Sequence, residues 1–298
     1  MTVFLILHYL SKEMTDECVS KLKDKIKDNN VKIIIVDNAS SNGTGLQLKR
    51  EYENDPQCEV LLNEKNIGFA RGNNIGYQYA RMHYLPDFVV IMNNDVLIED
   101  EKFIDKIETI YKATKFDVMG PDILATRIGI HQNPMRIKPY SKKELEDSLN
   151  EKKRLLAHYK LRYTMQYFNV QIKECIKRIL HWKSKSPENI NLLYKENRIE
   201  NPVLHGACLI FSKRFIKNEE VAFNPETFLF MEEDILHYTC RKKGYKLLYD
   251  SSVIVHHLED VSTNLEYKTD YEKGKMKIKN LIHSINVLLK LMNEDENI

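Results

Sequence analysis

Three clusters of polar side chains directly follow apolar stretches of this chain, and each has residue types that do chemistry. The first cluster is Asn93, Asn94 and Asp95, after the apolar residues 88–92. A carboxylate beside amide groups at the end of a buried strand suits a hard divalent cation that also binds phosphate oxygens. The same triplet could instead form a turn or cap the following helix, and the triplet by itself does not distinguish between these roles.

The second cluster is Glu232, Glu233 and Asp234, which follows the apolar residues 228–231 and opens an expected helix. Acids in a first helical turn often serve only as partners of the helix dipole. A partly desolvated carboxyl group, however, has a raised pKa and can act as a general base.

The third cluster is His256 and His257, which ends the apolar residues 253–255. A histidine in this position is a metal ligand or makes a structural hydrogen bond at the edge of a sheet. Successive side chains of a strand point to opposite faces, so only one of the two should face a site.

The elements that position these clusters alternate between strand and helix patterns over the first 125 residues. Strands are expected at residues 3–7, 32–36, 59–62 and 88–92, and helices at 16–27, 46–52 and 68–81. This alternation predicts an α/β fold with a largely parallel sheet. Ligands bind beyond the carboxyl ends of such strands. The polar residues at Asp37, 66–74 and 93–95 should therefore converge on one edge.

The chain after residue 125 divides into three further parts. Residues 126–202 read as a helical basic insertion, because residues 152–185 hold ten Lys or Arg and one acid. Its apolar residues recur at helical spacing, namely Met165, Phe168, Ile172, Ile176 and Ile179. Such a helix can lie on an anionic membrane surface or form a solvated face. Strand patterns return in residues 203–262, with strands expected at 205–211, 246–249 and 253–257 and a helix at 235–243. Residues 263–298 are expected to form a helical tail.

Composition narrows the class of protein. The 298 residues include 45 Lys or Arg and 43 Asp or Glu, a net charge of +2 that gives no sign of nucleic-acid binding. The five cysteines are odd in number and widely spaced, which favours a reducing compartment. The apolar run at residues 3–7 is too short for a signal peptide. We expect a cytoplasmic protein, with peripheral contact at the inner face of the cell membrane as an option.

Six segments together, in this order, resemble glycosyltransferase family 2. They are residues 37–43, 66–76, 93–95, 206–208, 228–245 and 253–257. The resemblance covers residues 1–125 and 203–262, and is greatest to the bacterial rhamnosyltransferase-like and capsular or cell-surface polysaccharide branch. It implies a GT-A fold, that is, a mixed, mostly parallel sheet flanked by helices.

The resemblance also implies roles for single residues. Asp37 matches the family acid near the nucleobase, and residues 66–76 match the loop beside the nucleotide and donor sugar. Asp95 is the charged ligand in a variant of the family's Asp-x-Asp metal motif. The family's Asn-Tyr-Asn turn after the first strand reads His8-Tyr9-Leu10 here. The implied donor-binding residues are Tyr9, Asp37, Asn66, Gly68, Arg71, Asn73, Asn93 and Asn94.

An ungapped alignment to the family pattern Phe-Leu-Tyr-Gly-Glu-Asp assigns the catalytic base to Glu233. Asp234 becomes the base only if a gap is allowed. The same ungapped alignment assigns the metal-binding histidine to His257 rather than His256. The implied cofactor is Mn²⁺ or Mg²⁺.

The expected reaction is inverting transfer of a hexose from a UDP- or dTDP-linked donor to a glycan or lipid-linked acceptor, in bacterial surface polysaccharide synthesis. Two alternatives belong to other classes. One is a peripheral membrane or polyanion-binding protein, which the basic residues 152–185 would serve. The other is a sugar nucleotidyltransferase, which also uses carboxylates and metal at a sheet edge, although no Gly-rich, Lys-containing loop lies near the N-terminus.

Overall fold

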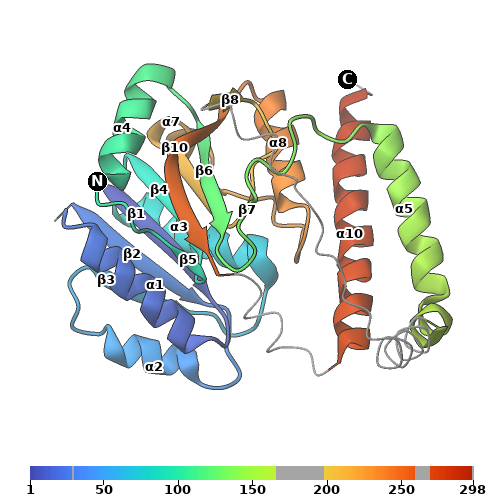
Figure 1. Ribbon diagram of the computed structural model, residues 1–298, viewed down its shortest axis with the longest axis horizontal. Helices are drawn as coiled ribbons and strands as arrows, with labels where there is room; N and C mark the ends of the chain where they lie inside the picture. Colours follow the sequence, from blue (N-terminus) through green and yellow to red (C-terminus); the bar gives the residue numbers. More distant parts are fainter. Residues whose placement is uncertain (29, 166–197, 259–268, 297–298) are drawn as a thin grey trace, which may run out of the picture.

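The computed structural model describes residues 1–28, 30–165, 198–258 and 269–296. A twisted sheet lies at the centre, with helices on both faces (Figure 1). The strands along it run in the order β3 (Cys58–Leu62), β2 (Val31–Asp37), β1 (Thr2–His8), β4 (Phe88–Asn93), β9 (Cys208–Ser212), β6 (Val118–Ala125), β10 (Leu247–His257) and β5 (Val96–Leu97). Two short strands extend it, because β7 (Ile130–His131) pairs with β6 and β8 (Arg198–Glu200) pairs with β10.

The sheet is mixed but has a parallel N-terminal half, which confirms the α/β prediction. Strands β3, β2, β1 and β4 are mutually parallel, and β10 is parallel to β6. Strand β9 lies antiparallel between β4 and β6. The helices that cover the N-terminal half are α1 (Lys12–Lys25), α2 (Thr44–Glu51), α3 (Gly68–His83) and α4 (Phe103–Thr114).

Two apolar cores result from alternation along the strands, one on each face of the sheet. In β1, Phe4 and Ile6 belong to the core that includes α1 and α4, whereas Leu5 belongs to the core that includes α3. Both faces of the strand are therefore buried, as expected for a parallel sheet covered by helices. This explains why the strands of the N-terminal half read as continuous apolar runs.

The sequence prediction was wrong about β10 and missed β6. Residues 246–249 and 253–257 were expected as two strands, but they form one strand with an irregularity between Asp250 and Ile254. Asp250 accepts hydrogen bonds from the N–H and the hydroxyl of Ser252, so the polar residues form a bulge rather than a turn between strands. Strand β6 was missed because Gly120, Pro121 and Asp122 interrupt its apolar pattern.

The second half of the chain adds further helices among the described residues. They are α5 (Lys142–Ala157), α7 (Lys213–Asn218), α8 (Glu232–Lys242) and α10 (Asp270–Glu296). Helices α5 and α10 lie side by side (Figure 1) and share a third apolar core with α8, which includes Leu145, Ile235 and Ile285. The expected insertion and tail thus pack together against α8, although the four-part division of the chain stays a prediction.

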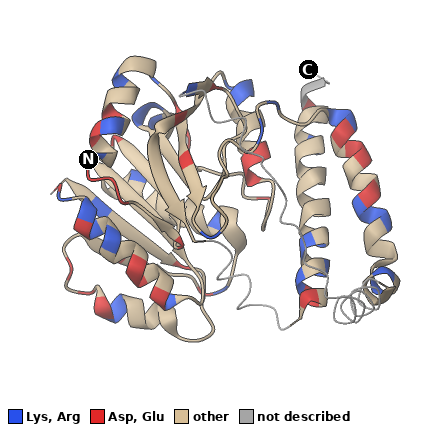
Figure 2. Cartoon of the chain, viewed as in Figure 1, with Lys and Arg blue, Asp and Glu red and all other residues tan. Residues whose placement is uncertain are grey.

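The basic stretch is only partly described. Along α5, basic and acidic side chains are interspersed rather than segregated (Figure 2). The apolar residues Phe168, Ile172, Ile176 and Ile179 and five of the ten basic residues lie outside the described residues. Contact with an anionic membrane surface therefore stays a prediction. Among the described helices, none is long and apolar enough to cross a membrane.

Asn74 ties α3 to the loop before α8. Its side-chain oxygen accepts hydrogen bonds from the N–H groups of Ala222 and Phe223, both at 3.0 Å. Its amide nitrogen donates to the carbonyl oxygen of Phe223 at 2.8 Å. Asn74 is only 5% exposed, so these hydrogen bonds are buried and water cannot replace the Asn74 side chain as a partner without a change in packing.

Replacing Asn74 with Ala should lower the free energy of unfolding by about 2–4 kcal/mol, because buried backbone groups lose their partners. Denaturant unfolding measures the change. Asn286→Ala is the control, since the Asn286 amide makes one exposed bond, to the carbonyl of Ile282. Equal effects of the two substitutions would contradict the role given to Asn74.

Candidate active site

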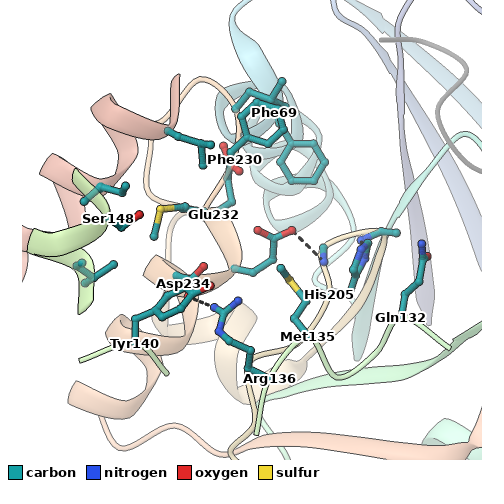
Figure 3. Close-up of a pocket in the computed structure, with 18 of the residues that line it drawn as sticks. Phe69, Gln132, Met135, Arg136, Tyr140, Ser148, His205, Phe230, Glu232 and Asp234 are labelled. Atoms are coloured by element: carbon teal, nitrogen blue, oxygen red, sulfur yellow. Dashed lines mark hydrogen bonds and ion pairs between the residues drawn. The ribbon is translucent and has the colours of Figure 1, made fainter. Parts of the chain in front are cut away.

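A cleft of about 660 Å³ opens at the carboxyl ends of the central strands. Its lining brings together parts that are far apart in the sequence: Asn93, His205, the three acids Glu232, Glu233 and Asp234, and His257. Figure 3 shows His205, Glu232 and Asp234 in this lining. The wall opposite the sheet comes from α5 and α10, with Leu145, Ser148, Lys152, Leu281 and Ile285. Of the polar residues expected to converge at one edge, Asn93 lines this cleft, whereas Asp37 and Asp95 do not.

Asp95 and His257 lie next to each other. Strand β5 begins directly after Asp95 and pairs antiparallel with the end of β10, with Val96 opposite His257. The backbone N–H of Leu258 donates to the carbonyl oxygen of Asp95 at 2.9 Å. This register brings His257 Nε2 to 3.3 Å from Asp95 Oδ1, with both side chains largely buried.

Gln132 fixes the proton on His257. The Nδ1 atom of His257 lies 2.7 Å from Gln132 Oε1. An amide oxygen only accepts, so Nδ1 carries the proton and, in the neutral ring, Nε2 presents its lone pair to Asp95. Asp95 Oδ1 is buried and has no hydrogen-bond donor among the described residues. Two acceptor atoms thus face each other.

A divalent cation fits this pair, because a carboxylate oxygen and an imidazole nitrogen are suitable ligands for Mn²⁺ or Mg²⁺. Across the described ranges, His, Cys, Asp and Glu do not form a group of three or more that could hold a metal ion. Asp95 and His257 would supply two ligands, and substrate oxygens and water would have to complete the shell.

The second histidine lies outside the cleft. His256 Nε2 is 3.5 Å from Glu99 Oε2 and does not line the cavity. The two neighbouring histidines of β10 thus have different surroundings, as the alternation of a strand predicts.

His205 is a cleft residue that sequence reasoning did not select. Its ring centre is 6.0 Å from that of His257, and its Nδ1 accepts a hydrogen bond from the N–H of Ala207 at 3.1 Å. Burial, and then the positive charge of His257 when its ring is protonated, lower the pKa of His205 to about 4. At neutral pH the ring is uncharged, with its proton on Nε2, so it can act as a hydrogen-bond donor.

The three consecutive acids have different partners. Glu233 Oε1 accepts a hydrogen bond from the backbone N–H of Gly206 at 3.2 Å. Asp234 forms an ion pair with Arg136, whose guanidinium group lies 4.0 Å from the centre of the Tyr140 ring. Burial raises the pKa of both carboxyl groups, and the charge of Arg136 acts against that rise at both, with a direct hydrogen bond only at Asp234. Of these two, Glu233 is the one without a cationic partner.

The start of α8 is strained. Phe230 and Met231 have φ angles of 74° and 65°, in the left-handed region. Each such non-glycine residue costs about 1–3 kcal/mol. The family pattern has Gly where this chain has Met231, so a left-handed backbone is adopted here without the residue that adopts it freely. This turn aims the first residues of α8 at the cleft.

The residues expected to bind the donor nucleotide gather near the ends of β1 and β2. Asp37 accepts hydrogen bonds from the N–H and hydroxyl of Ser40. Asn66 Oδ1 accepts from the amide of Asn38 at 2.9 Å and from the N–H of Gly68 at 3.0 Å. Gly68, at φ 84°, packs so closely on the backbone of Phe228 that a Cβ atom would lie 2.3 Å from its carbonyl oxygen.

Other expected donor residues are engaged within the fold. The Asn94 amide donates to Thr15 Oγ1 at 3.0 Å, beneath α1. Arg71 donates to the carbonyl of Pro225, and the Asn73 amide donates to that of Phe69. Tyr9, after β1, is partly exposed, and Asn93 lines the cleft. Donor contacts by these residues stay predictions.

Two site residues come from the segment that the sequence assigned to the insertion. Gln132 binds His257, and Arg136 binds Asp234. No motif surrounds either residue in the sequence, and the pairing of β7 with β6 and the bridge between Arg136 and Val203 bring the segment to the cleft. Sequence periodicity offers no signal for such contacts.

A family comparison agrees with this geometry. Residues 4–180 match the model of glycosyl transferase family 2. The chain belongs to that family. The chain is 26% identical over 129 residues to a curated protein, the low-salt glycan biosynthesis hexosyltransferase Agl10 of Haloferax volcanii. That match covers 43% of this chain and 38% of the relative, so the chain spans well under half of that protein's length.

Solved glycosyltransferases share the fold at low sequence identity. GalNAc-T7, solved with UDP, GalNAc and Mn²⁺, has a TM-score of 0.57 and 13% identity, over 88% of this chain and 44% of that one. The mannosyltransferase PcManGT of Pyrobaculum calidifontis, solved with GDP-Man and Mn²⁺, has a TM-score of 0.54 and 11% identity, over 97% of this chain and 71% of that one. TarS of S. aureus, solved with UDP-GlcNAc, has a TM-score of 0.52 and 14% identity, over 94% of this chain and 65% of that one. The GT-A fold expected from the sequence is confirmed.

Gly206 is predicted to be essential for the site but not for the fold. A Cβ atom there would lie 2.5 Å from Glu233 Oε1, so Gly206→Ala must displace the Glu233 carboxyl group. We expect loss of donor turnover by at least about tenfold, since a misplaced catalytic group loses its effective concentration, with a small change in melting temperature. Turnover close to that of the unchanged protein would show that the position of Glu233 does not matter.

Proposed function

We propose that this chain is an inverting glycosyltransferase that moves a hexose from a nucleoside diphosphate sugar to a hydroxyl group of a glycan or lipid-linked acceptor. The observation that carries the proposal is one cleft lined by both Glu233 and His257, whose imidazole lies 3.3 Å from Asp95. The resemblance of the sequence supports the finer proposals: a UDP- or dTDP-linked donor, and a role in bacterial surface polysaccharide synthesis in the cytoplasm.

The Asp95–His257 pair is proposed to hold Mn²⁺ or Mg²⁺. A bound cation there would act as a Lewis acid that offsets charge on a leaving diphosphate. Support comes from the orphaned Asp95 Oδ1 atom and from the lone pair that Gln132 directs toward it. GalNAc-T7 and PcManGT, which share the fold, were solved with Mn²⁺ together with UDP and GDP-Man, respectively, which is consistent with this role.

Glu233 is proposed as the general base. Its carboxylate takes the proton of the acceptor hydroxyl as that oxygen forms a bond to the anomeric carbon. The bond from the anomeric carbon to the diphosphate oxygen breaks, and the diphosphate leaves with the electron pair. Attack opposite the leaving group inverts the configuration. Burial raises the pKa of Glu233 toward that of an effective base, while the Gly206 N–H favours the ionised form.

Asp234 is less suited to the same role. Its carboxylate is already paired with Arg136, whose charge stabilises the ionised form and weakens its basicity. The ungapped alignment and the contacts of the two acids thus favour the same residue. The apolar wall from α5 and α10 would exclude water from the reaction, which protects the donor from hydrolysis.

Glu233→Gln keeps the size of the side chain and removes the proton acceptor. Transfer should fall by about 10²–10⁴-fold with little change in donor binding, because the lost interaction is used only in the transition state. The measurement is release of nucleoside diphosphate together with donor affinity. The matched variants are Glu232→Gln and Asp234→Asn.

Each alternative has its own signature in that assay. An inactive Asp234→Asn with an active Glu233→Gln would move the base to Asp234. Equal, small losses in all three variants would mean that the acids only cap the helix. Release of pyrophosphate instead of nucleoside diphosphate would identify a nucleotidyltransferase. A screen of nucleotide sugars with Mn²⁺, read by binding and slow hydrolysis, identifies the donor.

His257→Ala should weaken Mn²⁺ binding in the presence of UDP by at least about tenfold, as loss of a metal ligand or its support does. His256→Ala, which changes a side chain beside Glu99 outside the cleft, should leave it within about twofold. Titration calorimetry measures both affinities. A larger effect at His256 would show that the ligand assignment is displaced by one residue.

A further inference from the structure

Glu232 is a buried carboxyl group in the cleft that the proposed reaction does not use. Its side chain is 4% exposed and lines the cavity beside Glu233. Its Oε1 atom is buried and has no hydrogen-bond partner among the described residues. A buried oxygen without a partner costs about 1–3 kcal/mol, so a group kept in this state needs a function or a ligand.

The surroundings of Glu232 are aromatic on one side. In Figure 3 its carboxyl group extends toward Phe69 and Phe230, away from the Arg136–Asp234 ion pair. Phe230 precedes it in the strained turn, and Phe69 begins α3. The group is therefore directed into the part of the cleft that has ring faces rather than cations.

No cation compensates Glu232 within the described part of the chain, where no ion pair includes it. The neighbouring acids are Glu233 and Asp234, and Asp234 already holds Arg136. Hydrogen bonds from the Thr227 hydroxyl and from backbone N–H groups favour the ionised form of Glu232, but burial outweighs them.

The other charged groups on the neighbouring helices have contacts of their own. Lys277 of α10 lies 5.6 Å from the centre of the Phe230 ring. The remaining groups have other partners: Lys152 pairs with Glu151, Glu144 caps the start of α5, Lys290 pairs with Glu226, and Arg71 donates to the carbonyl of Pro225.

Burial, and then the charge of Glu233, raise the pKa of Glu232 to about 8. Two adjacent carboxyl groups in one cleft do not both ionise easily, so one keeps a proton while the other is free to accept one. Both carboxyl groups accept hydrogen bonds, Glu233 from the Gly206 N–H and Glu232 from the Thr227 hydroxyl and backbone N–H groups, but Glu232 Oε1 has no partner among the described residues and can carry a proton. The proton of the pair therefore belongs on Glu232.

We propose that Glu232 is a substrate-binding residue whose neutral carboxyl group hydrogen-bonds a sugar hydroxyl in the cleft. The inference rests on the proposed function. A protonated carboxyl both donates and accepts, as a sugar hydroxyl does. The rings of Phe69 and Phe230 supply the apolar surface that the C–H face of a sugar covers. Glu232 and Glu233 thus divide the work between binding and proton transfer.

The neutral state is tested without substrate, from melting temperatures of the unchanged protein and Glu232→Gln between pH 5 and 9. A carboxyl whose pKa is raised in the folded state holds its proton there while the unfolded chain releases it, so stability falls between about pH 4.5 and 8. The Gln variant lacks this loss. It should match the unchanged protein near pH 5 and melt higher above pH 8.

Glu226→Gln is the matched control, since Glu226 is exposed, and its difference from the unchanged protein should not vary with pH. A Glu232→Gln variant that melts lower than the unchanged protein above pH 8 would show an ionised, stabilised carboxylate and overturn the inference.

Binding is tested with UDP, UDP-GlcNAc and GDP-mannose as probes, with Mn²⁺. Glu232→Gln keeps a hydrogen-bonding group and should retain affinity, whereas Glu232→Ala should lose about tenfold, the effect of one buried hydrogen bond. A loss for the nucleotide sugar but not for UDP assigns the hydroxyl to the donor. A raised acceptor KM with unchanged donor affinity assigns it to the acceptor.

Unchanged values for Glu232→Ala in both measurements overturn the inference and leave the proposed function intact. If none of a full panel of nucleotide sugars binds the unchanged protein, the proposed function fails, and the role of Glu232 in sugar binding fails with it.

Discussion

The pairing of two short segments determines the geometry of the whole site. Strand β5 has two residues, and it pairs with the last two residues of β10, so that Val96 lies opposite His257. Asp95 comes immediately before this pair and His257 within it. A shift of one residue would exchange His257 for His256 and turn the imidazole away from Asp95. On its other side β10 runs parallel to β6, with His257 opposite Ala125, which supports this register.

A second constraint is the burial of like charges. Three consecutive acids open α8 at the cleft, where the dipole of the helix favours negative charge but burial opposes it. The structure resolves the conflict with three different environments: a guanidinium group for Asp234, a backbone N–H for Glu233, and aromatic surroundings for Glu232. Different environments give similar chemical groups different proton affinities, which the proposed division between sugar binding and proton transfer requires.

Much of the fold and part of the site could be predicted from the sequence. The strands of the N-terminal half were evident because helices bury both of their faces, which leaves continuous apolar runs such as that of β4. The proximity of Asp95 to His257 followed from an alignment and from strand alternation. Strand β6 was missed because Gly120 and Pro121 disguise it, and β10 was divided because its bulge reads as a turn.

The contacts of Gln132, Arg136 and His205 could not be predicted in the same way. They depend on tertiary pairing across long stretches of chain, and neither their spacing nor their neighbours mark them. Local pattern reports which face of an element is buried, but not which distant side chain it meets. The same limit applies to the third apolar core, where α5 and α10 meet α8 and complete the wall of the cleft.

The most direct test of the central claim is a crystal structure with Mn²⁺ and a nucleoside diphosphate, with data collected at the manganese absorption edge. The account predicts an anomalous peak in contact with Asp95 and His257 Nε2, with diphosphate oxygens completing its shell and Glu233 facing the cleft beyond them. Manganese and diphosphate bound elsewhere, with Asp95 and His257 still in direct contact, would contradict it.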